Sequence, residues 1–255
     1  MLLRTGLNRA AVPRTLKQLC RRHGTVVSYY DSQSGQHVTY TDAIHVHGLV
    51  FSPPTTIKPT TALGLDSITV ADPAWKDALV SLAHDKPIYL MYPPWTPSLS
   101  PLAVDLSCTS PREDWDDVLE KCTAASKLGL PVKATLTHAF ASTDVTIQLA
   151  GSLLADAGVG IITLDDSVDK LADQDNLLEA FEALTWCDVV GLPMKQRIGF
   201  RGSPLASEDL LLQAIQEHEI KHFDVCLQGG AYALDLLQLT RALDAAGASH
   251  GVVSQ

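Results

Sequence analysis

The stretch that decides the fold is residues 102–167, LAVDLSCTSPREDWDDVLEKCTAASKLGLPVKATLTHAFASTDVTIQLAGSLLADAGVGIITLDDS. Three apolar runs, at 102–107, 131–140 and 159–167, alternate with two helical patterns, at 112–130 and 143–158. Near-continuous apolar runs are typical of strands that are covered on both faces. In the helical patterns the apolar residues recur every three or four positions, which gives each helix one apolar stripe. Alternating units of this kind build a parallel sheet with right-handed crossovers.

Further predicted strands and helices alternate along the chain on both sides of this stretch. Eight strands are predicted, at 42–51, 66–70, 87–93, 102–107, 131–140, 159–167, 187–194 and 222–228. Further helices are predicted at 73–85, 176–186, 207–220 and 231–247, a hairpin at 25–41 and a loop at 195–204. Eight strands with alternating helices favour a (β/α)8 TIM-barrel fold, and an open doubly wound parallel sheet is the alternative. Two proline-rich segments, 52–61 and 93–101, replace covering helices and predict an irregular barrel.

Composition and charge describe a globular chain with a distinct N-terminus. Of 255 residues 46% are hydrophobic and 19% charged, and no apolar run is long enough to span a membrane. Residues 1–24 hold six of the 19 basic residues and no acidic one, whereas all 29 acidic residues lie in 25–255. An acidic body argues against binding to DNA. We therefore predict a basic N-terminal segment at 1–24 and a single α/β barrel domain at 25–255.

The basic segment resembles a mitochondrial targeting sequence, because leucines are interspersed among its arginines and it lacks acids. The expected location is the mitochondrial matrix, and the alternative is an ordinary basic first helix in a cytoplasmic protein. Five scattered cysteines without a Cys-x-x-Cys pair fit reduced thiols in either compartment.

The central stretch resembles the hydroxymethylglutaryl-CoA lyase-like family of TIM barrels. The matching residues are PREDWDDVLEKCTAASKLGLPVKATLTHAF at 111–140 and IITLDDSVD at 161–169, where the family ends its strand with Gly-Asp-Thr-Ile-Gly. GSPLASEDLLLQAIQEHEI at 202–220 is similar to the family's Gly-Asn-Leu-Ala-Thr-Glu-Asp-Leu run and its helix. A weaker match is LRTGLN at 3–8, which is similar to Leu-Arg-Asp-Gly-Leu-Gln at the family's first strand.

The resemblance implies a divalent metal ion, yet the residues that would hold it differ here. The family uses the Asp of its Arg-Asp-Gly motif, a His-x-His pair on a late strand and the Asn of Gly-Asn-Leu. Thr5 and Ser203 stand at the first and last of these positions, and no His-x-His follows Asp166. The family's Gly-rich loop with its reactive Cys is replaced by KQRIGFRGSP at 195–204. Because a hard cation needs several oxygen or imidazole ligands together, we predict no metal and no other cofactor.

Two residues at predicted strand ends are candidates for catalysis. His138 can act as acid or base near neutral pH, although the sequence identifies no partner for it. Asp166 lies where barrel enzymes place their chemistry. With Ser167 it matches the family's Asp-Thr pair, which the resemblance implies contacts the substrate. The alternative for Asp166 is an aspartate that caps the following turn.

Basic and histidine clusters give two further candidate sites. Lys195, Arg197 and Arg201 lie together in the predicted loop and can bind an anion such as a CoA phosphate, or else form a solvated surface. His45 and His47 lie on one face of the first strong strand, where they can be metal ligands or hydrogen-bonded histidines that point into the barrel interior or toward the helices.

The sequence favours a barrel that has lost metal-dependent carbon–carbon cleavage and serves as a non-catalytic structural or interaction subunit of a mitochondrial assembly. Its expected partners are other protein subunits, because uncovered barrel flanks expose apolar surface. The alternative is a lyase or aldolase-type enzyme that cleaves a C–C bond in an acyl-CoA or keto acid with His138 and Asp166. A ligand-binding barrel without chemistry is a third reading.

Overall fold

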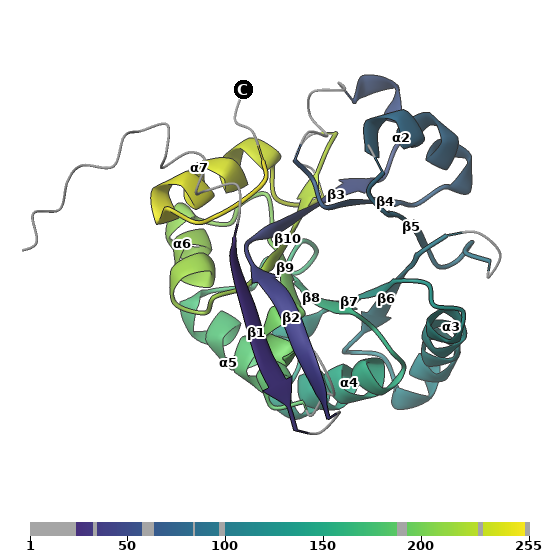
Figure 1. Cartoon of the computed structure of the whole chain (residues 1–255), viewed down its shortest axis with the longest axis horizontal. Helices are drawn as coiled ribbons and strands as arrows, with labels where there is room; N and C mark the ends of the chain where they lie inside the picture. The colour runs from purple at the N-terminus through teal and green to yellow at the C-terminus, as the bar shows by residue number, and fades with distance from the viewer. Residues whose placement is uncertain are drawn as a thin grey trace, which may run out of the picture.

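Eight parallel strands close into a barrel that is surrounded by helices, as Figure 1 shows in a view down the molecule's shortest axis. In this computed structural model the described residues are 24–32, 35–57, 64–83, 85–96, 100–187, 193–228 and 232–252. The barrel strands are β3 (His45–Val50), β4 (Ser67–Val70), β5 (Ile88–Met91), β6 (Leu102–Ser107), β7 (Val132–Thr137), β8 (Ile161–Asp165), β9 (Ile198–Arg201) and β10 (His222–Cys226). The last strand pairs with the first, with His222 opposite His45 and Cys226 opposite Leu49. This closure confirms the (β/α)8 barrel and excludes the open sheet.

The helices that cover the barrel begin at well-defined caps. Their bounds are α2 (Lys76–Ala83), α3 (Trp115–Lys127), α4 (Asp144–Asp156), α5 (Gln174–Thr185), α6 (Glu208–Gln216) and α7 (Leu236–Ala246). Short 3-10 turns lie at η1 (Pro54–Thr56), η3 (Pro73–Trp75), η4 (Arg112–Asp114), η5 (Ala139–Ala141) and η6 (Met194–Gln196). The side chains of Thr143 and Ser207 accept backbone N–H groups at the start of α4 and α6, as N-caps do. Because helices α4 and α5 pack together, as do α6 and α7, they form a continuous outer layer.

The seventh barrel strand differs from the sequence-based prediction. The predicted strand at 187–194 lies largely outside the described residues, and its last residue, Met194, begins a 3-10 turn. Instead, Ile198–Arg201, which was predicted as part of a loop, forms β9 and pairs with β8 and β10. The weak match at 3–8 also lies outside the described residues, and the first barrel strand is β3.

The interior of the barrel is polar, whereas the outer faces of its strands are apolar. In β7, Val132, Ala134 and Leu136 face the helices and alternate with the buried interior residues Lys133 and Thr135. The same alternation places charged side chains from β6, β8, β9 and β10 inside the barrel, and they are Asp105, Asp165, Arg201 and Asp224. The hydrophobic core therefore lies between the barrel wall and the helices.

The proline-rich connection after β5 covers its own flank. The described residues between β5 and β6 contain no helix, as predicted, but Trp95 is only 4% exposed and donates its indole N–H to the backbone oxygen of Ser100. After β3, Ile57 is also buried behind the turn η1. These two loops therefore place apolar side chains against the barrel where helices are missing.

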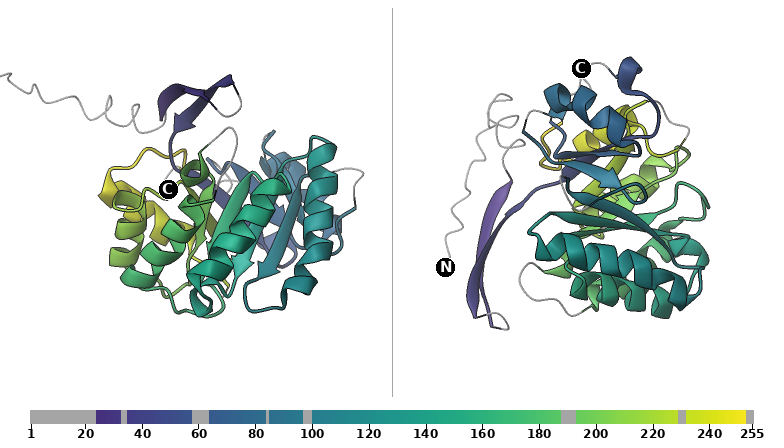
Figure 2. Two further views of the ribbon diagram at one scale, coloured as in Figure 1. Left: turned by 90° about the horizontal axis from the view of Figure 1, so that it is seen from below. Right: turned by 90° about the vertical axis from the view of Figure 1, so that its right-hand side faces the viewer.

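The predicted hairpin is present and lies at the N-terminal end of the barrel strands. Strands β1 (Thr25–Asp31) and β2 (Gln36–Asp42) pair antiparallel, and Asp42 forms an ion pair of 2.6 Å with Lys221, just before β10. Figure 2 shows the hairpin standing beside the barrel body, and all of its described residues are partly or fully exposed. Over the described ranges, no helix has the length and apolarity that a bilayer crossing requires.

Candidate functional site

Charged side chains from five strands, β6 to β10, meet inside the barrel. Lys133 on β7 forms a buried ion pair with Asp224 on β10. The other oxygen of Asp224 accepts hydrogen bonds from Nε and Nη2 of Arg201 at 3.3 and 3.2 Å. Nη2 also donates a hydrogen bond to the hydroxyl of Thr135 at 3.0 Å. Lys133, Arg201 and Asp224 are each at most 5% exposed. Burying charges costs free energy even when they are paired, so such a cluster is weak evidence for stability and points to a site.

Two more carboxylates lie next to Arg201, toward the C-terminal ends of the strands. Nη1 is 3.7 Å from Asp165 and 4.0 Å from Asp105. The Asp105 side chain is 39% exposed although it points into the barrel, so it faces a hollow that solvent can enter. Burial raises the pKa of Asp105, and the nearby positive charge of Arg201 offsets this only in part. A carboxyl group of this kind can exchange a proton with a ligand in the hollow.

The two buried cations are perturbed in opposite directions. Burial lowers the pKa of Lys133, and the charge of Asp224 restores only part of it. Burial also lowers the pKa of Arg201, but the carboxylates of Asp224, Asp165 and Asp105 together raise it above its usual value. Arg201 is therefore held firmly as a cation in the middle of the cluster.

His138 acquires a partner that the sequence does not reveal. Its Nδ1 lies 2.8 and 3.0 Å from the two carboxylate oxygens of Asp169, which belongs to the loop after β8. The histidine follows β7, and its side chain is 35% exposed. Its φ of 57° lies in the left-handed region, a conformation that costs a non-glycine residue about 1–3 kcal/mol and that clusters at functional sites. A carboxylate on Nδ1 orients the imidazole and leaves Nε2 to act as a base.

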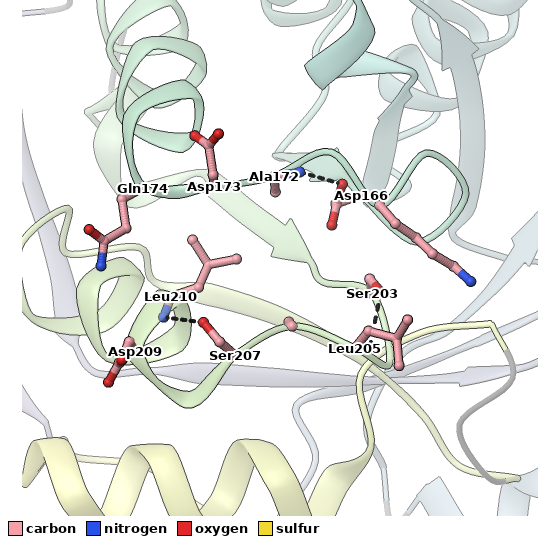
Figure 3. A pocket seen from close by; sticks show the side chains of 11 residues that line it. Asp166, Ala172, Asp173, Gln174, Ser203, Leu205, Ser207, Asp209 and Leu210 are labelled. Carbon is pink, nitrogen blue, oxygen red and sulfur yellow. Dashed lines mark hydrogen bonds between the residues drawn. The ribbon is translucent and has the colours of Figure 1, made fainter.

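Asp166 is fixed by the backbone of its own loop. One of its oxygens accepts the N–H groups of Leu171 and Ala172 at 2.6 and 2.8 Å, and its side chain lines a pocket of about 410 Å³. Figure 3 shows this pocket between the loop after β8 and the loop that leads into α6. Burial raises the pKa of Asp166, and the two backbone hydrogen bonds offset that effect only partly. The turn-capping alternative is thus present in the structure, together with a position on a pocket.

The other sequence-predicted residues are scattered over the two ends of the barrel. The backbone N–H of Ser167 donates to Asp165 at 2.8 Å. Lys195 and Arg197 precede β9 at the N-terminal end, where Lys195 pairs with Glu219 and Arg197 lies near Tyr29 of the hairpin. Arg201 lies at the other end of the same strand, inside the barrel. The prediction of one basic loop is therefore wrong, because β9 separates its members.

His45 and His47 belong to a hydrogen-bonded stack near the N-terminal end of the barrel. The backbone oxygen of Gln196 can only accept, so His222 donates Nε2–H to it at 2.9 Å. His222 Nδ1 then accepts from His47 Nε2 at 2.9 Å, and His47 Nδ1 accepts from the Ser67 hydroxyl at 2.7 Å. Burial lowers the pKa of His222 to about 3 and that of His47 well below its usual value, so both rings are neutral. His45 instead pairs with Asp66 at 3.2 Å.

The residues at the C-terminal end do not fit the divalent metal ion that the sequence resemblance implies. Within the described ranges, no group of three or more His, Cys, Asp or Glu side chains is arranged to hold a metal ion. The carboxylates that do converge, Asp105, Asp165 and Asp224, surround the guanidinium of Arg201. The positive charge among these oxygen donors is therefore a side chain of the protein itself.

Sequence reasoning missed Asp105, Lys133, Asp224 and Asp169. The first three interrupt the apolar runs LAVDLS, PVKATLT and HFDVC at positions that alternate with apolar residues. In a strand of a closed barrel, a charged residue at such a position faces the interior. That pattern is the signal that could have found them, whereas nothing local marks Asp169 as the partner of His138.

Comparisons with known proteins agree with the fold. No protein-family model and no curated protein matches the chain. Among solved structures, HMG-CoA lyase from Brucella melitensis is similar with a TM-score of 0.64 and 13% identity, over 83% of this chain and 94% of that one. The N-terminal domain of a putative aldolase from Bacteroides vulgatus matches with a TM-score of 0.58 and 13% identity, over 79% of each chain. The carboxyl transferase domain of Rhizobium etli pyruvate carboxylase matches with a TM-score of 0.56 and 12% identity, over 83% of this chain and 45% of that one. At these identities the likeness shows the fold alone, a (β/α)8 barrel.

Proposed function

We propose that this chain is an enzyme of the lyase or aldolase type that acts on a small hydroxy- or oxo-carbonyl compound at the C-terminal end of its barrel. The observation that carries the proposal is the buried charged cluster with the Asp105 carboxylate facing a solvent-accessible hollow. A barrel kept only as a scaffold gains nothing from such a cluster, because apolar residues of similar size are as stabilising or more so.

The proposed reaction uses two groups toward the C-terminal end of the barrel, the His138–Asp169 pair and the Arg201 guanidinium. His138, oriented by Asp169, removes the proton of the substrate hydroxyl, and the C–C bond next to it breaks. The electron pair of that bond moves onto the neighbouring carbonyl group and forms an enolate. The Arg201 guanidinium, which is fixed before the reaction by Asp224 and Thr135, stabilises the enolate oxygen. The protonated His138 then returns its proton to carbon, and the histidine is neutral again.

The charges around the site favour a small substrate over an acyl-CoA. The pocket beside Asp166 is lined by three aspartates, Asp166, Asp173 and Asp209, against one lysine, Lys170. The basic residues that were expected to hold a CoA phosphate, Lys195 and Arg197, lie at the opposite end of the barrel. A polyanionic group is repelled by an acidic rim.

The test is the exchange of α-protons, which reports enolate formation without a known physiological substrate. The wild-type protein is incubated in D2O with pyruvate and other short 2-oxo acids, and the loss of proton signal is followed by NMR. We expect exchange by the wild type, with a loss of about 10²-fold or more in His138→Gln and in Arg201→Met. Lys195→Ala serves as the control and should exchange at the wild-type rate. Equal rates in the wild type and His138→Gln would contradict the proposal.

A second candidate is the non-catalytic interaction subunit that the sequence favours. It is supported by apolar side chains on the hairpin, where Val26 is 67% and Tyr30 is 59% exposed. The protein's mass in solution and its co-purification from mitochondria test this candidate. A monomer that is recovered without partners would contradict it.

Import into mitochondria is a separate proposal that rests on the basic segment 1–24. A fluorescent protein that carries this segment at its N-terminus should collect in the mitochondrial matrix. Diffuse cytoplasmic fluorescence would contradict the proposal.

A further inference from the structure

Three carboxylates converge on the guanidinium of Arg201 from three different strands. Asp224 on β10 accepts two of its N–H groups at 3.3 and 3.2 Å. Asp165 on β8 and Asp105 on β6 lie 3.7 and 4.0 Å from Nη1. Three carboxylates supply oxygen donors of the kind that hard divalent cations prefer. In the folded chain they are spaced around a guanidinium and are not arranged to hold an ion, so the cation among them is a side chain.

The contacts of Arg201 divide it into a fixed side and an open side. Nε and Nη2 are held by Asp224 and Thr135, so the planar group cannot rotate freely. The separations of Nη1 from Asp165 and Asp105 are longer than a hydrogen bond. Nη1 can therefore donate to an oxygen of a ligand that enters the hollow beside the exposed carboxylate of Asp105.

We propose that Arg201 is the resident cation of this site: it takes the place of a divalent metal ion among the three carboxylates and binds an oxyanion of the ligand through Nη1. The ligand it suits carries a carboxylate or enolate oxygen that accepts from Nη1. This inference deepens the proposed function by naming its cation. Its test reads cation binding, so it can fail or succeed independently of the exchange experiment.

The experiment removes the guanidinium and asks whether a metal ion replaces it. Arg201→Ala and the larger Arg201→Gln are purified, and their thermal unfolding is measured with and without Mn²⁺. Both variants should unfold at a lower temperature than the wild type, because the three carboxylates lose their counter-charge. Mn²⁺ should raise the unfolding temperature of both in a saturable way, while the wild type should not respond. Arg197→Ala, which removes an arginine at the other end of β9, should behave as the wild type does.

A double variant connects the new binding to the named carboxylates. Arg201→Ala combined with Asp105→Asn should bind Mn²⁺ on the order of tenfold more weakly than Arg201→Ala alone. The inference is overturned if wild type and Arg201→Ala bind Mn²⁺ equally. It is also overturned if neither single variant gains stability from Mn²⁺, whether the variants fold and ignore the ion or stay unfolded in its presence.

Discussion

His138 illustrates how a single residue gains a role from its surroundings. It leaves β7 in a left-handed conformation, and the loop after β8 brings Asp169 to its Nδ1. The strained backbone and the carboxylate together fix the ring at the end of the barrel where TIM-barrel enzymes place their chemistry. A substitution of either His138 or Asp169 is therefore expected to disturb the same hydrogen-bonded pair.

The first residue-scale prediction concerns Asp169. Asp169→Asn keeps the size of the side chain but no longer favours the ring orientation and tautomer that leave Nε2 as a base. We expect the rate of α-proton exchange to fall by about 10²-fold or more while the circular dichroism spectrum stays unchanged. An unchanged exchange rate would show that the pair is not used.

The second residue-scale prediction concerns Asp224, which neutralises two buried cations at once. Asp224→Asn leaves Lys133 and Arg201 without their shared carboxylate, so we expect a loss of about 3–5 kcal/mol in the free energy of unfolding. Urea denaturation measures the loss. Asp209→Asn, an exposed aspartate at the start of α6, is the matched control and should cost less than about 1 kcal/mol. Similar values for the two variants would mean that the cluster contributes little.

At the scale of the element, β10 and β3 are tied together by neutral histidines, which makes the barrel sensitive to acid. The pKa of His222 is about 3 in the folded chain, against an ordinary value of 6.5. Between these two pH values the unfolded chain binds more protons than the folded chain. The stability that the neutral His222 ring contributes is therefore fully present above about pH 6.5 and is lost as the pH falls below that value. Burial is the main cause, and the neighbouring His45 and Lys133 also lower the pKa of both buried rings, His47 and His222, because nearby positive charge disfavours protonation.

The prediction at this scale is a loss of stability between about pH 7 and about pH 5, of up to about 1.4 kcal/mol per pH unit for each of the two buried rings. Urea denaturation at the two pH values gives the difference. His222→Gln should show a clearly smaller difference, because one titrating ring is gone. His37→Gln, which changes an exposed histidine on β2, should keep the wild-type difference. A pH-independent wild type would contradict neutral burial of these rings.

Seven of the eight barrel strands could be predicted from sequence because their outer faces are apolar. The exception is β9, which is as short as β4 and β5 but carries Gly199 and Arg201 on its interior face. The nearby residues 187–194 form a longer apolar run, which the local pattern favours as the strand. Gly199 is required because a Cβ there would lie 2.8 Å from the Thr163 hydroxyl and 3.2 Å from the Cβ of His222. Tertiary crowding of this kind leaves no mark in local periodicity.

The candidate site could be predicted only in part. The position of His138 and Asp166 after consecutive barrel strands follows from the strand pattern, and both do lie at the C-terminal end. Arg201 was identified as a basic residue, but its place inside the barrel depends on β9, which the pattern did not reveal. The partners Asp169, Asp224 and Asp105 come from other strands and loops, so only the closed barrel brings them together.

At the scale of the whole molecule, the barrel closes only because its first strand, β3, pairs with its last strand, β10. A chain that ends at Lys221 lacks β10 and α7, loses Asp224 and His222, and leaves both β3 and β9 with an open edge. We expect this chain to show no cooperative thermal unfolding and to aggregate, because exposed strand edges pair with other chains. A chain that ends at Val252 should unfold as the full chain does. Calorimetry and solution mass compare the two, and a cooperative transition in the shorter chain would contradict the prediction.

The pairing of β3 with β10 also has a consequence for how the protein is made. β3 leaves the ribosome early, whereas its partner β10 is synthesised near the end, so one edge of the growing sheet waits for most of translation. Contacts between residues so distant in sequence form slowly, because a long loop must close first. Through most of its synthesis, the nascent chain therefore exposes an unpaired strand edge with an apolar outer face. Chaperones bind surfaces of this kind.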